Sequence, residues 1–290
     1  MNGLTEPASI RELLSRHGFR FSKSMGQNFL IDAGVPERIA ESVGADRDCA
    51  VLEIGPGIGC LTAELAKRAG KVLTVELDRS LAPLLKETLG EYDNVEILFS
   101  DVLKLDLRQT VGEKCPQETK LVCANLPYNI TSPVLTELIR TDMFDRICVM
   151  IQKEVAERMC AGPGNKDYGA FGLFVQWYYE PELLFTVPAH CFMPQPKVTS
   201  AVIRLTRRTN APCEVEDEKL LFRVVRAAFN QRRKTLVNAL ASGFPELGKV
   251  NCEEVIKLCG LDTNIRGEML DLGDFAKISN EIRHLKDNDL

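Results

Sequence analysis

Three segments in the first half of the chain carry residue types that could build a ligand site, and the first is a glycine turn. In the segment Val51–Thr62, Gly55, Gly57 and Gly59 follow a run of apolar residues. Glycines in such a turn let the backbone bend sharply and let a ligand lie directly on it. The spacing lacks the Lys-Ser/Thr of a phosphate loop, and it differs from the Gly-x-Gly-x-x-Gly fingerprint of dinucleotide sites.

Two carboxylates follow the next two apolar runs. Glu76 stands 21 residues after Gly55, and Asp101 comes directly after Ser100. A carboxylate at the first position can accept hydrogen bonds from both hydroxyls of a ribose, and one at the second could face an adenine amino group. Each acid alone could be a solvated residue at the end of a strand. Together with the glycine turn they predict a nucleoside pocket, with Glu53 either supporting the turn or exposed to solvent.

The third segment, Asn125-Leu126-Pro127-Tyr128, ends the fourth apolar run. By itself it could be only a strand-to-helix turn, but its place beside the predicted pocket favours a chemical role. An exocyclic amine of a base is a poor nucleophile, so alkylating it requires acceptors that hold both N–H groups. Asn125 can offer a side-chain oxygen and Leu126 a backbone carbonyl. Pro127 stiffens the turn, and Tyr128 can stack on an extruded base.

The elements that must position these residues alternate along the chain between short apolar runs and helical patterns. Such alternation predicts βαβ units and a mostly parallel sheet with both faces covered. Two later runs, Glu182–Val187 and Ala201–Leu205, predict an antiparallel ending. From about Thr206 only helical spacing follows, over Leu220–Leu240 and Glu253–Cys259. The expected strands are Ala50–Ile54, Lys71–Glu76, Val95–Phe99, Lys120–Ala124 and Arg146–Ile151, with helices at Leu61–Ala69, Leu81–Leu89 and Pro133–Arg140.

Composition indicates a folded, non-exported protein. Of the 290 residues 45% are hydrophobic and 27% are charged, which excludes disorder as a description of the whole. We expect no membrane segment, because each apolar run is far shorter than the roughly 20 residues that a bilayer requires. The N-terminus lacks the pattern of a signal peptide. Ten cysteines without any Cys-x-x-Cys, and three widely separated histidines, indicate thiols in a reducing compartment and no metal site.

The predicted pocket resembles that of the class I S-adenosylmethionine-dependent methyltransferases, whose cofactor has no phosphate. The Asn-Leu-Pro-Tyr segment is similar to the motif of amino-methyltransferases acting on adenine or cytosine. Leu126 narrows the likeness to the rRNA adenine N6,N6-dimethyltransferases. Met25–Asp32, Val187–Ser200 and Val224–Leu236 also look like segments of that family, and the likeness runs from about residue 8 to about 275.

The resemblance implies a fold, a reaction and site residues. The fold would be α/β: a Rossmann-like seven-stranded methyltransferase sheet over residues 1–206, followed by a small all-helical rRNA-binding domain over 207–290. Asn28 and Leu30 would contact S-adenosylmethionine together with Gly55, Gly57, Glu76, Asp101 and Asn125. Phe192 would supply an aromatic face opposite Tyr128. The substrate would be two adjacent adenosines in the 3′-terminal hairpin of 16S rRNA, within an immature small subunit, and the protein a cytoplasmic monomer.

An uneven charge distribution fits an RNA partner. The net charge is −5, yet residues 197–234 hold ten basic and four acidic residues. A basic segment on an acidic protein can form a local face for a polyanion, although a charge run can also be only a solvated surface. A basic lead-in, Arg11, Arg16, Arg20 and Lys23, precedes the Met25–Asp32 motif. Residues expected to contact RNA phosphates are Arg223, Arg226, Arg232, Arg233 and Lys234.

Three alternatives remain open at this point. The family's antibiotic-resistance relatives dimethylate an adenosine of the large-subunit rRNA with the same catalytic pocket. A non-catalytic assembly protein could keep the fold while losing Asn125 or Tyr128, both of which are present. A nicotinamide-dependent dehydrogenase would need a different glycine spacing.

Overall fold

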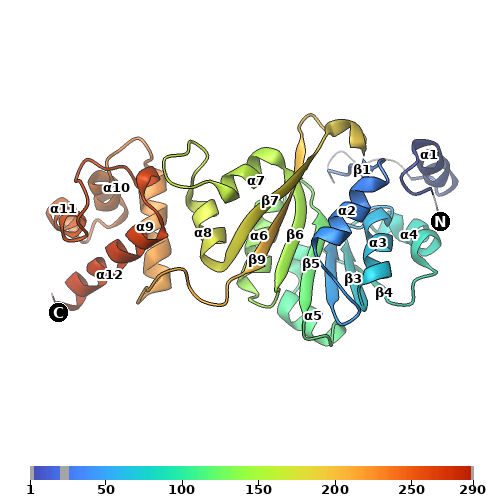
Figure 1. Ribbon diagram of the computed structural model, residues 1–290, viewed down its shortest axis with the longest axis horizontal. Helices are drawn as coiled ribbons and strands as arrows, with labels where there is room; N and C mark the ends of the chain where they lie inside the picture. Colours follow the sequence, from blue (N-terminus) through green and yellow to red (C-terminus); the bar gives the residue numbers. More distant parts are fainter. Residues whose placement is uncertain (1–2, 20–25, 289–290) are drawn as a thin grey trace. The chain divides into compact units, whose positions relative to one another are not determined.

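The computed structural model describes residues 3–19 and 26–288, shown in Figure 1. The chain divides into two compact units. The first contains Met1–Ala156 and Pro181–Arg207, and the second contains Glu157–Glu180 and Arg208–Leu290. Arg20, Lys23 and Met25 of the N-terminal segment lie outside the described residues.

The first unit is built around a seven-stranded sheet in the order β4-β3-β2-β5-β6-β9-β7. The strands from β4 to β6 are parallel to their neighbours, and β9 runs antiparallel to β6. This arrangement confirms the predicted α/β class, the seven-stranded sheet and an antiparallel ending. The strands are β2 (Ala50–Ile54), β3 (Lys71–Glu76), β4 (Val95–Phe99), β5 (Lys120–Asn125), β6 (Arg146–Gln152), β7 (Tyr179–Val187) and β9 (Ser200–Arg207).

Both faces of the central strands are buried, which explains why they read as continuous apolar runs. Successive residues Val51 and Leu52 of β2 point to opposite faces, and both are at most 1% exposed. On one face, Val51 joins a core with side chains of α2 and α3, such as Ile39 and Leu65. The helices of this unit are α1 (Pro7–Arg16), α2 (Gly34–Ser42), α3 (Cys60–Arg68), α4 (Ala82–Leu89), α5 (Leu107–Lys114) and α6 (Thr131–Arg140).

Two short strands form a separate ladder beside the sheet. β1 (Phe29–Leu30) pairs antiparallel with β8 (Phe192–Met193), so that Leu30 lies opposite Phe192. β8 lies between β7 and β9, in a segment for which the sequence predicted no strand. Isolated pairs of this length carry little sequence signal, because their stability comes from tertiary packing.

The second unit is mainly helical. Helix α9 begins at its N-cap Asp217, whose side chain accepts a hydrogen bond from the Leu220 N–H at 3.0 Å. The helical spacing expected over Leu220–Leu240 is interrupted after Asn230, and α10 begins at Leu236. The helices are α8 (Ala170–Tyr178), α9 (Glu218–Asn230), α10 (Leu236–Gly243), α11 (Gly248–Leu258) and α12 (Leu272–Asn288), while α7 (Lys153–Cys160) spans the boundary between the units.

The division into units differs in one respect from the expected boundary between residues 206 and 207. Residues 157–180, which we expected in the catalytic domain, cluster with the C-terminal helices. The reason is packing: Leu173 and Trp177 of α8 belong to the same buried core as Val224 of α9. The Tyr168 hydroxyl also donates a hydrogen bond to the Leu270 carbonyl oxygen at 2.8 Å. A helix inserted between strands can thus belong to the core of a later segment.

Candidate functional site

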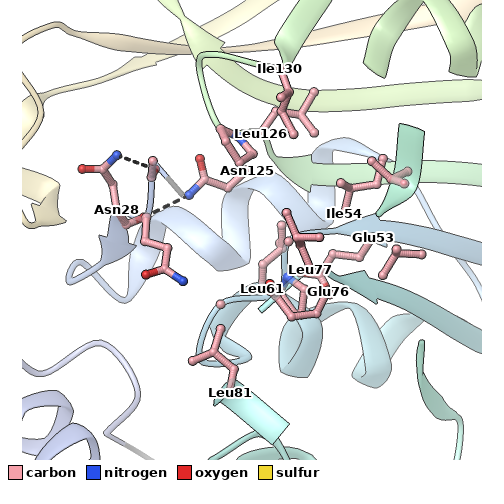
Figure 2. Close-up of a pocket in the computed structure, with 18 of the residues that line it drawn as sticks. Asn28, Glu53, Ile54, Leu61, Glu76, Leu77, Leu81, Asn125, Leu126 and Ile130 are labelled. Carbon is pink, nitrogen blue, oxygen red and sulfur yellow. Dashed lines mark hydrogen bonds between the residues drawn. The ribbon is translucent and has the colours of Figure 1, made fainter. Parts of the chain in front are cut away.

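A pocket lies at the carboxyl ends of β2, β3 and β5, as Figure 2 shows. In the strand order, β3 lies on one side of β2 and β5 on the other, so the chain reverses its direction of winding there. Ligands of open parallel sheets bind at such a switch point. The walls are formed by Gly26–Leu30, the glycine turn after β2, the ends of β3 and β4, and the segment 125–130.

The glycine turn requires glycine at all three positions. Gly55, Gly57 and Gly59 have φ angles of 70°, 59° and 91°, which side chains rarely adopt. A Cβ added to Gly57 would lie 3.1 Å from Cε1 of Phe29, whereas one added to Gly55 would meet no atom within 4 Å. Gly55 therefore presents bare backbone to open space inside the pocket, where a ligand can approach it closely.

Glu76 at the end of β3 is a buried carboxylate that no described cation neutralises. The residue is 6% exposed, and burial raises the pKa of its carboxyl. Oε1 accepts a hydrogen bond from the Asp78 N–H at 2.7 Å. A buried carboxylate is costly unless donors surround it. The two hydroxyls of a ribose are neutral donors that fit this need.

Asp101 also lines the pocket, at the end of β4. Its Oδ1 accepts a hydrogen bond from the Leu103 N–H at 3.1 Å, which caps the 3-10 turn Val102–Lys104. Its Oδ2 lies 3.6 Å from Nζ of Lys104. The structure thus brings Asp101 to the same pocket as Glu76 and the glycine turn.

Glu53 lies beneath the turn and is only 1% exposed, so it is not a solvated acid. The Thr62 hydroxyl of α3 donates to its Oε2 at 2.6 Å. This bond joins the strand before the turn to the helix after it. Burial is the main cause that raises the pKa of Glu53 to about 8, and the nearby charge of Glu76 adds to the shift.

Asn125 is held in one orientation by the N-terminal segment. Its Nδ2 donates to the backbone carbonyl oxygen of Asn28 at 3.3 Å, a bond drawn in Figure 2. The bond fixes the orientation of this side-chain amide, whose Oδ1 is the atom that can accept a hydrogen bond from a ligand. The side-chain Nδ2 of Asn28 in turn donates to the Gly26 carbonyl oxygen at 3.0 Å.

The rest of the Asn125–Tyr128 segment forms a fixed turn. The Leu126 N–H donates to the Met150 carbonyl oxygen of β6 at 3.1 Å, and the Pro127 carbonyl oxygen accepts from the Ile130 N–H at 3.2 Å. The Tyr128 hydroxyl and the Oγ of the buried Ser200 lie 2.7 Å apart, within hydrogen-bond distance. Burial raises the pKa of Tyr128. The half-buried phenol ring therefore has a fixed position at the pocket wall.

Phe192 is the predicted site residue that the structure does not bring to the pocket wall. Its side chain is 3% exposed and packs in a core that also contains Leu30, Val35 and Val187. Leu30 lines the pocket, whereas Phe192, its partner in the β1–β8 ladder, is not among the lining residues. The expected role of Phe192 as a second aromatic face stays a prediction.

Comparison with known proteins agrees with this geometry. The ribosomal RNA adenine dimethylase family matches residues 18–283. The chain belongs to this family. It is 47% identical over 287 residues to the ribosomal RNA small subunit methyltransferase A of Geobacillus thermodenitrificans, covering 97% of this chain and 98% of the relative. The corresponding protein of Lachnoclostridium phytofermentans is 49% identical over 283 residues, or 96% of this chain and 97% of the relative.

Solved structures give the same picture. A dimethyladenosine transferase from Plasmodium falciparum superposes with a TM-score of 0.74 at 26% identity, covering 88% of this chain and 97% of that chain. The 23S rRNA methyltransferase ErmE gives a TM-score of 0.69 at 26% identity, covering 88% and 99%. The protein is therefore an rRNA adenine dimethyltransferase with a Rossmann-like sheet.

The basic residues expected to bind RNA fall into two groups in the second unit of this dimethylase. Arg223 forms an ion pair with Glu246 at 2.8 Å, and its guanidinium lies 4.1 Å from the ring centroid of Phe244. Arg232 donates to Glu268 at 2.6 Å. These two side chains are engaged within the protein. Arg226, Arg233 and Lys234 are exposed, and no described acid pairs with them.

Further basic residues of the 197–234 run also have acidic partners. Arg204 pairs with Glu182, and Arg207 lies 2.7 Å from Asp145. The surface that this segment forms therefore carries less positive charge than the count of its basic residues indicates. The acidic residues that neutralise these side chains are distant in the chain, so no local sequence pattern predicts the ion pairs.

Three residues that form hydrogen bonds at the site were not among the predicted residues: Gln27, Asp78 and Ser200. Gln27 lies inside the Met25–Asp32 motif, and Asp78 comes two residues after Glu76, so each had a local signal. Ser200 contacts Tyr128 from 72 residues away, which the sequence could not reveal. The described residues contain neither a cluster of His, Cys, Asp and Glu suited to a metal ion nor a helix long and apolar enough to cross a membrane.

Proposed function

We propose that this dimethylase transfers methyl groups from S-adenosylmethionine to N6 of two adjacent adenosines in the 3′-terminal hairpin of 16S rRNA. Its substrate would be an immature small ribosomal subunit in the cytoplasm. The observation that carries the proposal is the orientation of Asn125. The bond from Nδ2 to the Asn28 carbonyl oxygen fixes the side-chain amide, and Oδ1 is its acceptor in the pocket that the glycine turn also lines. The high identity to relatives named as small subunit methyltransferases supports the choice of subunit.

The pocket fits S-adenosylmethionine on its own chemistry. Gly55 offers bare backbone to the ligand, and Glu76 is a buried carboxylate suited to the ribose hydroxyls. Asp101 would accept from the adenine amino group, and Asn28 and Leu30 would close the pocket from the N-terminal side. S-adenosylmethionine would supply an electrophilic methyl group there.

The protein's own part in the reaction is to hold the amine. Asn125 Oδ1 and the Leu126 carbonyl oxygen would accept the two N–H groups of the target adenine, which favours a pyramidal nitrogen with its lone pair free. Tyr128 would stack on the extruded base. The departing proton becomes acidic once the nitrogen is alkylated, so no general base is needed. The raised pKa of Tyr128 is consistent with a stacking role rather than proton abstraction.

RNA binding is proposed for the helical unit. Arg226, Arg233 and Lys234 are exposed and would contact backbone phosphates directly. Arg223 and Arg232 would first have to leave Glu246 and Glu268. We therefore assign the larger share of phosphate binding to the first three. We also propose that the protein acts as a monomer and without a metal.

Transfer of labelled methyl groups into ribosomal precursors tests the proposal. Under-methylated small subunits should be labelled and yield N6,N6-dimethyladenosine, while large-subunit precursors should not. Asn125→Ala should lower the transfer rate by roughly a hundredfold or more, because one preorganised acceptor is lost. Binding of S-adenosylhomocysteine by this variant should change little.

Two results would count against the proposal. Labelling of the large-subunit precursor instead would favour the function named for ErmE, the structural relative with a TM-score of 0.69. Equal loss of transfer and of cofactor binding in Asn125→Ala would mean that Asn125 does not hold the amine.

A further inference from the structure

The segment Gly26–Leu30, called the strap below, contacts a different wall of the pocket with each of three successive residues. Gln27 reaches the turn after β3, Asn28 reaches Asn125, and Phe29 packs on the glycine turn. We propose that Gln27 is a positioning residue, which couples the cofactor-side carboxylate Glu76 to the orientation of Asn125 through this strap. The inference rests on the proposed function, because it takes Glu76 as the ribose ligand and Asn125 as the amine acceptor.

The first half of the connection runs from Glu76 to Gln27. The Asp78 N–H donates to Oε1 of Glu76 at 2.7 Å, and Nε2 of Gln27 donates to Oδ2 of Asp78 at 2.9 Å. Oδ1 of Asp78 accepts from both the N–H and the hydroxyl of Ser80, at 3.0 and 2.6 Å. Ser80 thus fixes the Asp78 carboxylate, so that its second oxygen faces Gln27.

The second half runs from Gln27 to Asn125 through one peptide unit. Asn28 follows Gln27 in the chain, and its carbonyl oxygen accepts a hydrogen bond from Nδ2 of Asn125 at 3.3 Å (Figure 2). The strap is confined on both sides of this bond. A Cβ on Gly26 would lie 3.3 Å from Oδ1 of Asn129, and the ring of Phe29 lies against Gly57. A displacement of Gln27 is therefore passed to the Asn28 carbonyl, because the strap has little room to absorb it.

The functional consequence is a link between cofactor binding and amine binding. Asn125 presents Oδ1 to the target amine only while Nδ2 stays on Asn28. A ligand that fixes Glu76 and its turn also fixes Asp78, and hence Gln27 and the strap. Cofactor binding would thereby complete the amine site before the base arrives.

Two substitutions that swap the amide and the carboxylate of the Gln27–Asp78 hydrogen bond test this link. Gln27→Glu places two carboxylates against each other and should lower kcat at saturating cofactor by about tenfold, the effect of losing one hydrogen bond to a charged group. Adding Asp78→Asn to that variant supplies an amide N–H to the new carboxylate at position 27, while the amide carbonyl oxygen still accepts from Ser80. The double variant should recover kcat to within about threefold of wild type, because a charge-assisted hydrogen bond is restored.

A matched control is available on α5. Nε2 of Gln109 donates to Glu113 at 2.9 Å on an exposed helix face, so Gln109→Glu creates a similar carboxylate pair away from the pocket. This variant should leave kcat unchanged. The assay uses full-length protein, under-methylated small subunits and labelled S-adenosylmethionine, with S-adenosylhomocysteine binding measured by calorimetry.

The outcomes separate the inference from the proposed function. An unchanged kcat in Gln27→Glu, or no recovery in a folded double variant, would overturn the coupling alone. A rise in cofactor Kd with kcat intact would also overturn it, because Gln27 would then serve only the cofactor side. Failure of the wild-type protein to bind S-adenosylhomocysteine would overturn the proposed function, and the inference with it.

Discussion

Replacing Glu53 by Gln should remove a pH-dependent loss of stability from the first unit. Glu53 is 1% exposed, and the pKa of its carboxyl is raised from an ordinary value of 4.5 to about 8. The folded state therefore binds more protons than the unfolded state between these two values. Stability contributed by this group is present at low pH and falls as pH rises toward 8. Gln cannot ionise, yet its carbonyl oxygen can still accept the hydrogen bond of Thr62.

The magnitude follows from the two pKa values. Each pH unit over which the folded state holds one extra proton costs about 1.4 kcal/mol, so the wild type should lose about 3 kcal/mol relative to Glu53→Gln between pH 5 and pH 8. Other titrating groups cancel in the comparison of the two proteins. Urea unfolding followed by circular dichroism measures the difference. Tryptophan fluorescence would not report on this unit, because the single tryptophan, Trp177, belongs to the other unit.

Glu113→Gln on the exposed face of α5 should give a curve parallel to that of the wild type. A constant difference in unfolding free energy between wild type and Glu53→Gln across this pH range would refute the reasoning. Glu53 would then ionise at an ordinary pKa, and burial beneath the turn would not control it.

Further predictions concern the cofactor and the RNA. Glu76→Ala should weaken binding of S-adenosylhomocysteine by roughly 10- to 150-fold, the loss of about 1.5–3 kcal/mol from a charge-assisted contact, and an unchanged titration would contradict the assignment. Arg226→Ala and Arg233→Ala should each reduce the slope of log affinity for rRNA against log salt concentration by about one, without altering stability. Arg223→Ala should instead lower the free energy of unfolding by about 1 kcal/mol, because its guanidinium stacks on Phe244. Equal salt slopes for all three variants and the wild type would remove this surface from the RNA interface.

The sequence alone predicted the features that depend on local residue patterns. Buried parallel strands are continuous apolar runs, so β2, β3 and β4 begin and end at the predicted residues. The ends of such strands meet at one edge of the sheet, so the glycine turn, Glu76, Asp101 and Asn125 could be placed in one pocket from the sequence alone. The domain boundary expected from the shift to helical spacing stays a prediction, since residues 157–180 also cluster with the C-terminal helices.

Tertiary structure decided what depends on partners far away in the chain. The sequence of helix α8 does not show that it packs with the C-terminal helices. Only the buried core that contains Trp177 shows this. The charge run does not show that Arg223 and Arg232 are held by Glu246 and Glu268. The orientation of Asn125 depends on a carbonyl oxygen 97 residues away. A sequence specifies which groups are present and how local elements are spaced, whereas hydrogen bonds and ion pairs form between groups that only the completed fold brings within a few ångströms.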